Sequence, residues 1–182
     1  VFDSEFGDII EKIKPELKNI DCFVQIIDTE PENKNIDSIE YEKFLETSPD
    51  GEHFVDLDSE EDVVTINYTS GTTGLPKGVQ YSSRGAYISA LGNVMESSMS
   101  STTNYLWTLP MFHCNGWTYP WAVTAAGGTH VCLRQVRADE IFRLISEEEV
   151  TNMCCAPTVL TAMYTSKDAE GQDLSKLTIM VG

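Results

Sequence analysis

From residue 63 onward, the sequence alternates short apolar segments with longer segments whose apolar residues recur at helical spacing. The segments with strand character are 63–68, 105–109, 129–133, 151–155 and 177–181. The segments with helix character are 84–99, 116–126, 139–149 and 157–165. Strands that alternate with helices usually lie in a parallel sheet whose two faces are covered by helices. We therefore predict an α/β fold with a mostly parallel sheet flanked by helices.

The first 62 residues have a weaker pattern and most of the negative charge. Apolar residues at helical spacing predict a helix from Phe6 to Leu17, which Pro15 should shorten or kink. A strand is expected over 23–27 and a short helix over 38–46. Residues 1–62 carry 20 Asp and Glu against 5 Lys and Arg, whereas the remaining residues carry 9 against 7. The acidic segment is interpreted as hydrated surface, and a ligand site is expected in the second part.

The net charge and the cysteines limit the partners and the location of the chain. A formal charge of −17 at pH 7 repels nucleic acids and anionic membrane surfaces. No segment approaches the roughly 18 apolar residues of a transmembrane helix, so none is expected. The five cysteines form no CxxC pair and are odd in number, which argues against a disulfide framework. We expect a reducing intracellular location, the cytoplasm, with the peroxisome or the mitochondrial matrix as alternatives.

A zinc site is the alternative that these cysteines leave open. The candidate ligands form three pairs, namely His113 and Cys114, His130 and Cys132, and Cys154 and Cys155. Adjacent ligands suit a tetrahedral site poorly, and the usual ligand spacing is missing. We therefore predict no metal-ligating residues.

The loop after the first strand of the second part has the composition of a phosphate-binding loop. Residues 69–78 read TSGTTGLPKG. The glycines let the backbone approach a ligand closely, the hydroxyls offer hydrogen bonds, and Lys77 offers a positive charge. The pattern GxxxxGK[ST] is not satisfied, because Pro76 stands before Lys77. Composition alone suits the oxygens of a polyphosphate, and it also suits a flexible linker.

The order of the residues carries more information than their composition. The segment TSGTTGLPKG resembles the phosphate-loop signature of the AMP-forming acyl-activating enzymes, which include acyl-CoA synthetases, aryl-CoA ligases, luciferases and peptide-synthetase adenylation domains. Residues 105–117, YLWTLPMFHCNGW, resemble the next motif of this superfamily in its short- and medium-chain fatty acyl-CoA ligase branch. Residues 127–134 and 155–160 are also similar to that branch. The resemblance covers the whole chain and is weakest over residues 1–60.

The resemblance implies an AMP-forming acid–thiol ligase with ATP, Mg²⁺ and coenzyme A. A carboxylate attacks the α-phosphorus of ATP to give an acyl-adenylate and pyrophosphate, and the thiol of coenzyme A then displaces AMP. Backbone amides, hydroxyls and Lys77 would neutralise the phosphates, with magnesium. The positions expected to contact the nucleotide are Thr69, Ser70, Gly71, Thr72, Thr73, Gly74 and Lys77. Lys77 and His113 are the predicted catalytic residues.

Two roles are considered for His113, a structural one and a catalytic one. A single His after Pro-Met-Phe is more often a hydrogen-bonded structural residue than a catalyst. By resemblance, however, it matches an aromatic position that lies near the carboxylate and the adenylate. Met111 and Trp117 could line the acyl pocket, although such residues more often belong to a core. No role is assigned to three arginines, which are expected at the surface or paired with carboxylates: Arg84, Arg134 and Arg137.

The chain also departs from the family pattern. Ser83 stands where many relatives have His, which should leave phosphate binding intact. The Tyr-Gly-x-Thr-Glu segment that binds adenine, the ribose-binding Asp and the C-terminal domain with its catalytic Lys are not in the sequence. We therefore expect a part of a larger N-terminal domain, with residues 1–62 as an acidic portion and residues 63–182 as the portion with the phosphate loop and acyl site. By itself, this chain is not expected to complete the reaction.

Two alternatives stay open at this stage. The chain could be a catalytically incomplete remnant without activity of its own, or it could belong to an aryl-CoA ligase or a peptide-synthetase adenylation domain. The expected partners are a small carboxylic acid, ATP and coenzyme A.

Overall fold

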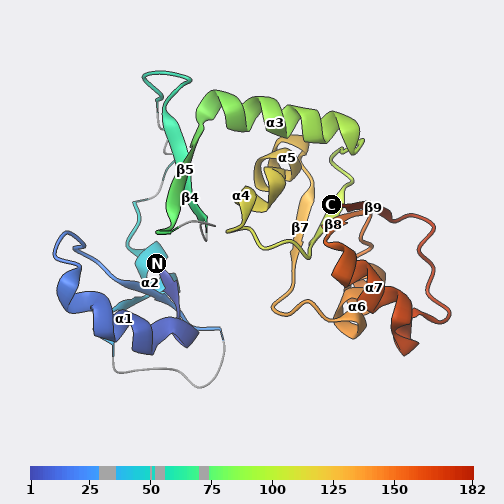
Figure 1. The fold of residues 1–182 in the computed structure, drawn as a ribbon, viewed down its shortest axis with the longest axis horizontal. Coiled ribbons are helices and arrows are strands. Elements are labelled where there is room, and N and C mark those ends of the chain that lie inside the picture. Colours follow the sequence, from blue (N-terminus) through green and yellow to red (C-terminus); the bar gives the residue numbers. More distant parts are fainter. Residues whose placement is uncertain (29–35, 50, 52–55, 70–73) are drawn as a thin grey trace. The chain divides into compact units, whose positions relative to one another are not determined.

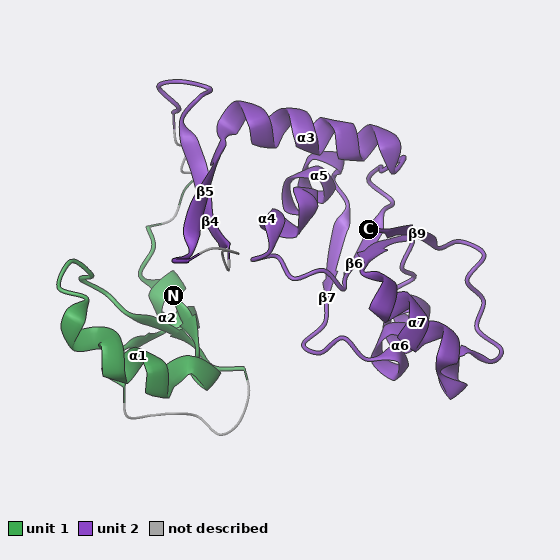
Figure 2. Cartoon of the chain, viewed as in Figure 1, with its two compact units in different colours: residues 1–55 green, residues 56–182 purple. Residues whose placement is uncertain are grey.

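The structure is a computed structural model that describes residues 1–28, 36–49, 51, 56–69 and 74–182. The chain divides into two compact units, residues 1–55 and 56–182 (Figure 2). None of the described helices is both long enough and apolar enough to span a bilayer.

Unit 1 contains a small parallel sheet with short helices. Its strand order is β1 (Phe2–Asp3), β2 (Val24–Ile26) and β3 (Ile39–Glu40). Helix α1 (Gly7–Ile13) ends before Pro15, and a 3₁₀ turn over Lys14–Glu16 follows, as expected for a proline that cannot continue the hydrogen-bond ladder. Helix α2 (Tyr41–Glu46) begins after Glu40, whose carboxylate accepts hydrogen bonds from the first backbone N–H groups of the helix.

Unit 2 is organised around a four-stranded parallel sheet (Figure 1). The strand order is β7 (Thr129–Cys132), β6 (Asn104–Trp107), β8 (Asn152–Cys155) and β9 (Thr178–Val181). The helices are α3 (Ser83–Glu96), α5 (Tyr119–Ala126), α6 (Ala138–Glu147) and α7 (Pro157–Thr165). The predicted α/β fold with mostly parallel strands is thereby confirmed.

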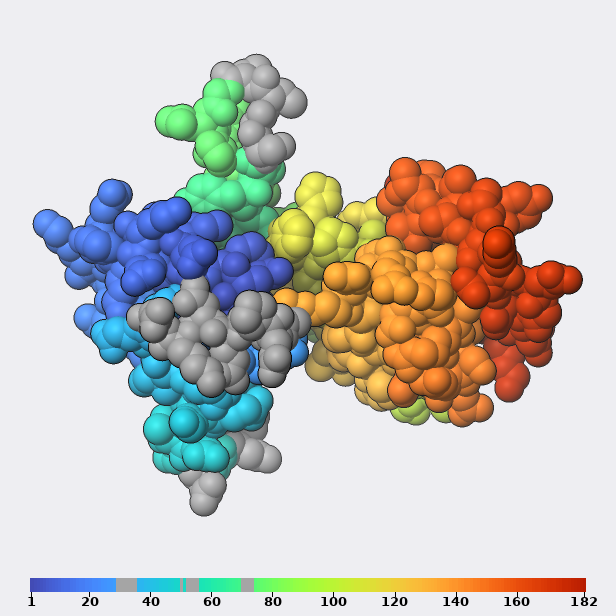
Figure 3. All heavy atoms as spheres, turned by 90° about the horizontal axis from the view of Figure 1, so that it is seen from below, coloured from blue at the N-terminus to red at the C-terminus, as the bar shows by residue number. Residues whose placement is uncertain are grey.

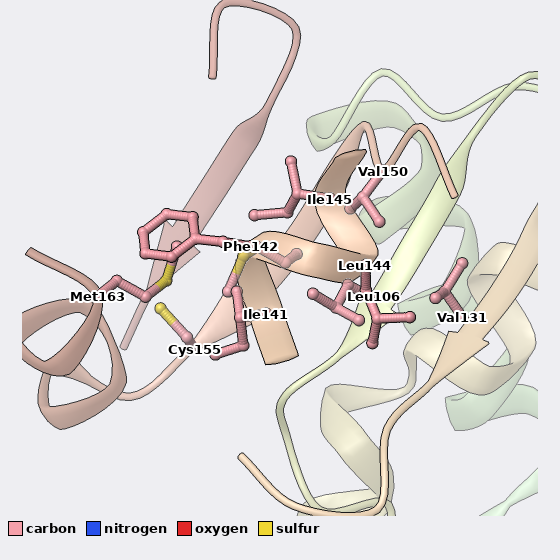
Figure 4. Close-up of a cluster of buried hydrophobic side chains, with 10 residues drawn as sticks. Leu106, Val131, Ile141, Phe142, Leu144, Ile145, Val150, Cys155 and Met163 are labelled. Atoms are coloured by element: carbon pink, nitrogen blue, oxygen red, sulfur yellow. The ribbon is translucent and has the colours of Figure 1, made fainter. Parts of the chain in front are cut away.

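One face of this sheet is covered by α6 and α7. Leu106 of the central strand β6 lies in one buried cluster with Ile141 and Phe142 of α6 (Figure 4). Met153 of the neighbouring strand β8 belongs to the same cluster. The other buried members of this cluster are Val131, Leu144, Ile145, Val150, Cys155 and Met163. In the space-filling view, the orange and red segments that include α6 and α7 lie side by side (Figure 3). The helix predicted over 139–149 is therefore confirmed as α6, and its apolar residues are the buried ones.

The other face of the sheet is covered by α3 and α5. Tyr105 and Trp107 alternate with Leu106 along β6, so they point to the opposite face. Tyr105 stacks on Tyr119 with the ring centroids 5.0 Å apart, and it meets Trp107 edge to face at 4.9 Å. Helices thus cover both faces, which explains why the central strands are apolar on both sides.

Helix α3 packs differently from what its apolar pattern suggests. The small residues Ala86 and Ala90 are buried, and α3 contacts α5, because small side chains let two helix backbones approach closely. The larger apolar side chains of α3 are exposed in this chain: Tyr87, Ile88, Leu91 and Met95. Ser82 caps the helix by accepting a hydrogen bond from the backbone N–H of Gly85.

The segment after the predicted first strand contains a strand that the sequence analysis missed. Strand β4 (Val63–Thr69) pairs antiparallel with β5 (Lys77–Ser82), whereas a loop over 69–78 leading to a helix was expected. The strand was hidden because its apolar alternation is limited to Val79 and Tyr81 and because Gly78 has a low strand propensity. In the hairpin Gly78 lies against Ile66. A Cβ atom at residue 78 would be only 3.0 Å from Cγ2 of Ile66, which favours a glycine here.

Candidate functional site

The hairpin holds the two ends of the predicted phosphate loop next to each other. Thr69, the last residue of β4, is paired with Lys77, the first residue of β5. The Thr69 hydroxyl lies 3.5 Å from the carbonyl oxygen of Lys77. Gly74 has a φ of +155°, an angle that a residue with a side chain would rarely adopt. A Cβ atom at this position would meet no other atom within 4 Å. The remaining predicted contacts, Ser70, Gly71, Thr72 and Thr73, lie outside the described residues.

A pocket of about 300 Å³ lies beside this hairpin, between β4, β5 and the segment after β6. Its lining residues are Asn67, Tyr68, Thr69, Val79, Tyr81, Phe112, His113 and Cys114. The structure therefore brings Thr69 and His113, two predicted site residues that are far apart in the sequence, to the walls of one pocket. Among these described lining residues, none is acidic, so the walls do not repel an anionic ligand.

The hairpin is joined to the segment around His113 by hydrogen bonds from one face of β4. Asn67 Nδ2 donates to the carbonyl oxygen of Phe112 at 2.8 Å. The Thr65 hydroxyl donates to Asn115 Oδ1 at 3.3 Å. Thr65, Asn67 and Thr69 alternate along the strand and share this polar face. Sequence reasoning missed this role, although the alternation of polar residues in the strand was a visible signal.

The residues after His113 form a left-handed turn. The φ angles of Cys114, Asn115, Gly116, Trp117 and Thr118 are 50°, 50°, 53°, 57° and 65°. A left-handed conformation costs roughly 1 kcal/mol or more for each residue that has a Cβ atom. The predicted helix over 116–126 was therefore wrong at its start, because the first residues belong to this turn (α4, Cys114–Trp117) and α5 begins at Tyr119.

Contacts from α3 and β6 brace the left-handed turn. Asn93 Nδ2 donates to the carbonyl oxygen of Trp117 at 2.7 Å and to the Thr118 hydroxyl at 2.9 Å. The Ser89 and Thr118 hydroxyls share a hydrogen bond at 2.8 Å. The Trp107 ring lies so close to Gly116 that a Cβ atom there would be 2.6 Å from the ring. These contacts offset the conformational cost of the turn.

His113 lies at the start of this turn and faces the pocket. Its Nε2 is 3.8 Å from the Cys114 sulfur. Of the two residues considered for an acyl pocket, Trp117 packs against the core that contains Trp107, and Met111 is partly exposed. The core interpretation is therefore the better one for Trp117.

Two of the arginines without an assigned role are paired with carboxylates, as expected. Arg84 is 2.5 Å from Glu60, and Arg137 pairs with Asp139. The zinc alternative gains no support from the described part of the chain, where no three His, Cys, Asp or Glu side chains gather as a metal site would require.

His130, one of the zinc candidates, is a hydrogen-bonded partner of the core. Trp107 Nε1 donates to His130 Nδ1 at 2.9 Å, so Nδ1 must be unprotonated. The Thr124 hydroxyl donates to the Pro120 carbonyl at 2.7 Å and therefore accepts from His130 Nε2 at 3.0 Å. This network holds a neutral imidazole with its proton on Nε2. Burial likewise lowers the pKa of His130 below its ordinary value.

The lowered pKa of His130 predicts a specific dependence of stability on pH. The folded protein binds this proton less readily than the unfolded chain, so stability is full above the unfolded pKa of about 6.5 and falls as the pH drops below it. We expect the melting temperature to decrease more between pH 7.5 and 5.5 in the wild type than in His130→Gln, which cannot be protonated. Differential scanning fluorimetry at both pH values measures this. Equal decreases would show that His130 does not titrate differently on folding.

Comparison with known proteins adds to this geometry. The profile of a family described as AMP-binding enzyme matches residues 4–182. A peroxisomal trans-cinnamate:CoA ligase from Petunia hybrida is 45% identical over 148 residues, which are 80% of this chain and 26% of that protein. The peroxisomal butyrate–CoA ligase AAE11 from Arabidopsis thaliana is 55% identical over 101 residues, which are 56% of this chain and 18% of that protein. The chain thus spans about a quarter or less of the length of these two relatives.

Two solved structures share the fold. The anthranilate CoA ligase AuaEII in complex with anthranoyl-AMP matches 98% of this chain and 35% of its own length, with a TM-score of 0.79 and 24% identity. The inhibitor-bound N-terminal domain of FACL13 from Mycobacterium tuberculosis matches 99% of this chain and 43% of its own length, with a TM-score of 0.78 and 22% identity. At these identities the likeness concerns the fold, which is that of an N-terminal ligase domain.

Proposed function

Because the chain belongs to the AMP-binding enzyme family, we propose that the protein containing it is an AMP-forming acid–thiol ligase. In this reaction a carboxylate oxygen attacks the α-phosphorus of ATP, and pyrophosphate leaves with the electrons of the bond that breaks. The thiol sulfur of coenzyme A then attacks the carbonyl carbon of the acyl-adenylate, and AMP leaves. This chain contributes the loop for the phosphates and part of the site for the acid.

The observation that carries the proposal is the pocket shared by Thr69 and His113. Thr69 belongs to the loop whose residues suit polyphosphate, and His113 follows a strand end of the parallel sheet, where ligands of α/β proteins usually bind. One pocket that adjoins both is therefore suited to hold the reacting carboxylate next to the phosphates. Attack by one anion on another requires nearby positive charge and hydrogen-bond donors.

The phosphate-binding role falls to the loop from Thr69 to Gly78. Its backbone amides and hydroxyls donate hydrogen bonds to phosphate oxygens, and the Lys77 ammonium neutralises part of their charge. Magnesium supplies further charge neutralisation on the phosphates when it is bound. Because the described lining of the pocket includes no carboxylate, the ion would be held by the phosphates of ATP and by water rather than by side chains of this lining.

The acid is proposed to be a small monocarboxylate, either short aliphatic or aromatic. The relatives named above act on cinnamate and butyrate according to their names. Here the pocket walls include Val79, Tyr81 and Phe112, which offer apolar contact to such a group. The same two relatives are described as peroxisomal, so a peroxisomal location is proposed in preference to the cytoplasm.

The proposal is tested with the whole protein that contains this chain. Incubation with ATP, Mg²⁺, coenzyme A and a panel of short aliphatic and aromatic acids should yield acyl-CoA and AMP in equal amounts for at least one acid. Chromatography separates AMP from ADP, which distinguishes attack at the α-phosphorus from attack at the γ-phosphorus. Absence of acid-dependent AMP with every acid, or formation of ADP instead, would refute the proposal.

A further inference from the structure

The hairpin and the His113 segment are connected by Asn67 and Thr65, and neither the sequence motifs nor the family match assigns a role to Asn67. We infer that Asn67 is a positioning residue, which holds the backbone at His113 in a fixed position beside strand β4, the strand that ends at Thr69. The inference rests on the proposed function for its catalytic consequence, but its structural part stands on the contacts alone.

The Asn67 hydrogen bond lies directly beside His113. Its amide donates to the carbonyl oxygen of Phe112, the residue directly before His113, at 2.8 Å. The opposite orientation of the amide would set two oxygens against each other, so the donor assignment follows from chemistry. A bond to the main chain fixes the peptide from which the His113 side chain extends. Asn67 therefore acts on the position of His113 and not on a distant part of the fold.

Strand β4 also holds the segment on the other side of His113. The Thr65 hydroxyl donates to Asn115 Oδ1 at 3.3 Å, and it also lies 3.5 Å from Asn67 Oδ1. Two connections from β4 thus flank the dipeptide His113–Cys114. A segment held on both sides has little freedom to shift along the strand.

The segment after His113 does not hold its conformation through local backbone preference. Cys114, Asn115 and Trp117 are left-handed residues with a Cβ atom, a conformation that the isolated chain disfavours. Asn93 braces the far end of the turn at Trp117 and Thr118. On the pocket side, the brace comes from β4. Loss of the Asn67 contact should therefore free the His113 end, because the local backbone preference does not restore it.

Strand β4 leads directly into the phosphate loop. The strand ends at Thr69, and Ser70 follows it directly in the sequence. Asn67 is two residues from that end and shares its face of the strand with Thr69. One rigid strand therefore carries both the start of the phosphate loop and the support of His113, so that the acid and the phosphates are held at a defined separation.

The test is a double-mutant cycle in the whole protein, using Asn67→Ala, His113→Ala and the double variant. If Asn67 acts through His113, Asn67→Ala should lower kcat for acid-dependent AMP formation about 10-fold in the wild-type background and less than 2-fold in the His113→Ala background. Such non-additivity is expected when two residues serve one function. The matched control is Gln80→Ala, an exposed residue of the neighbouring strand β5, which should leave kcat unchanged in both backgrounds.

A second measurement does not depend on activity. Cys114 and Cys132 are both exposed, so their alkylation by iodoacetamide can be followed in one sample by peptide mass spectrometry. Asn67→Ala should speed alkylation of Cys114 at least 3-fold relative to Cys132, because it frees the segment that contains Cys114. Gln80→Ala should leave the ratio unchanged.

The outcomes separate the inference from the proposed function. An equal kcat loss from Asn67→Ala in both backgrounds would mean that Asn67 contacts a ligand directly or only supports the fold, and would overturn the inference. An unchanged Cys114 alkylation ratio would overturn it as well. If the wild-type protein forms no AMP with any acid, the proposed function has failed, and the alkylation ratio alone then decides whether Asn67 positions the segment.

Discussion

Replacing Lys77 with Ala is expected to slow AMP formation about 100-fold and to change the melting temperature little. Removing a donor that stabilises developing charge in a reaction typically costs two to three orders of magnitude in rate. Lys77 is exposed at the start of β5, and no ion pair of its side chain is recorded in the described part of the chain. Its replacement should therefore change stability by no more than about 0.5 kcal/mol. Initial rates at saturating acid, with ATP varied, measure the effect.

Two further variants control this result. Lys176→Ala removes another exposed lysine of unit 2 and tests whether a general loss of positive charge is responsible. Lys77→Arg keeps the charge and should retain more activity than Lys77→Ala, although the planar guanidinium does not reproduce the geometry of an ammonium group. An unchanged rate in Lys77→Ala would mean that the loop does not bind the phosphates.

Replacing Gly116 with Ala is expected to destabilise the protein by about 2–4 kcal/mol. Its φ of +53° disfavours any residue with a Cβ atom, and the new atom would lie 2.6 Å from the Trp107 ring. Because the ring is packed in the core with Tyr105, it cannot move away without breaking other contacts. Urea unfolding followed by tryptophan fluorescence measures the change.

Gly92 supplies the matched control for Gly116. It lies inside α3, and a Cβ atom there would meet no atom within 4 Å. Gly92→Ala should therefore stabilise the protein by about 0.5–1 kcal/mol, because alanine favours a helix and restricts the unfolded chain. Destabilisation of similar size in both variants would show that the left-handed turn and its contact with Trp107 are not the cause.

The sequence predicted well those helices and strands in which the regularly spaced apolar residues are also the buried ones. Helix α6 has apolar residues on one face only, and Ile141, Phe142, Leu144 and Ile145 are all buried. The central strands were recognisable because both of their faces are apolar, which is typical of a parallel sheet between helices. Pro15 ended a helix where its missing N–H group requires it.

The elements that the sequence did not reveal depend on contacts between distant segments. Strand β5 was hidden because Gly78 weakens its pattern, and it is stabilised by pairing with β4. The left-handed turn contains only one glycine, Gly116, so local preference alone would favour a right-handed helix. Its conformation is held by hydrogen bonds from Asn93 to Trp117 and from Thr65 to Asn115, and neither Asn93 nor Thr65 is near the turn in the sequence.

In the candidate site, too, the features visible in the local sequence were predicted, and those that depend on contacts between distant segments were not. The loop TSGTTGLPKG was recognisable because its residue order resembles a family signature, and His113 was recognisable for the same reason. That Thr69 and His113 line one pocket depends on the pairing of β4 with β5 and on the turn that follows His113. The polar face of β4 could have been noticed in the sequence, but its partners could not, because they are 45 and 50 residues away.

The central claim is that the loop from Thr69 to Gly78 holds the phosphates of ATP while a carboxylate attacks its α-phosphorus. The exchange of labelled pyrophosphate into ATP tests this most directly, because it reports the first step alone and needs no coenzyme A. We predict exchange that requires one of the small carboxylic acids and falls about 100-fold in Lys77→Ala. Acid-dependent exchange that is undiminished in Lys77→Ala, or no exchange with any acid of the panel, would contradict the account.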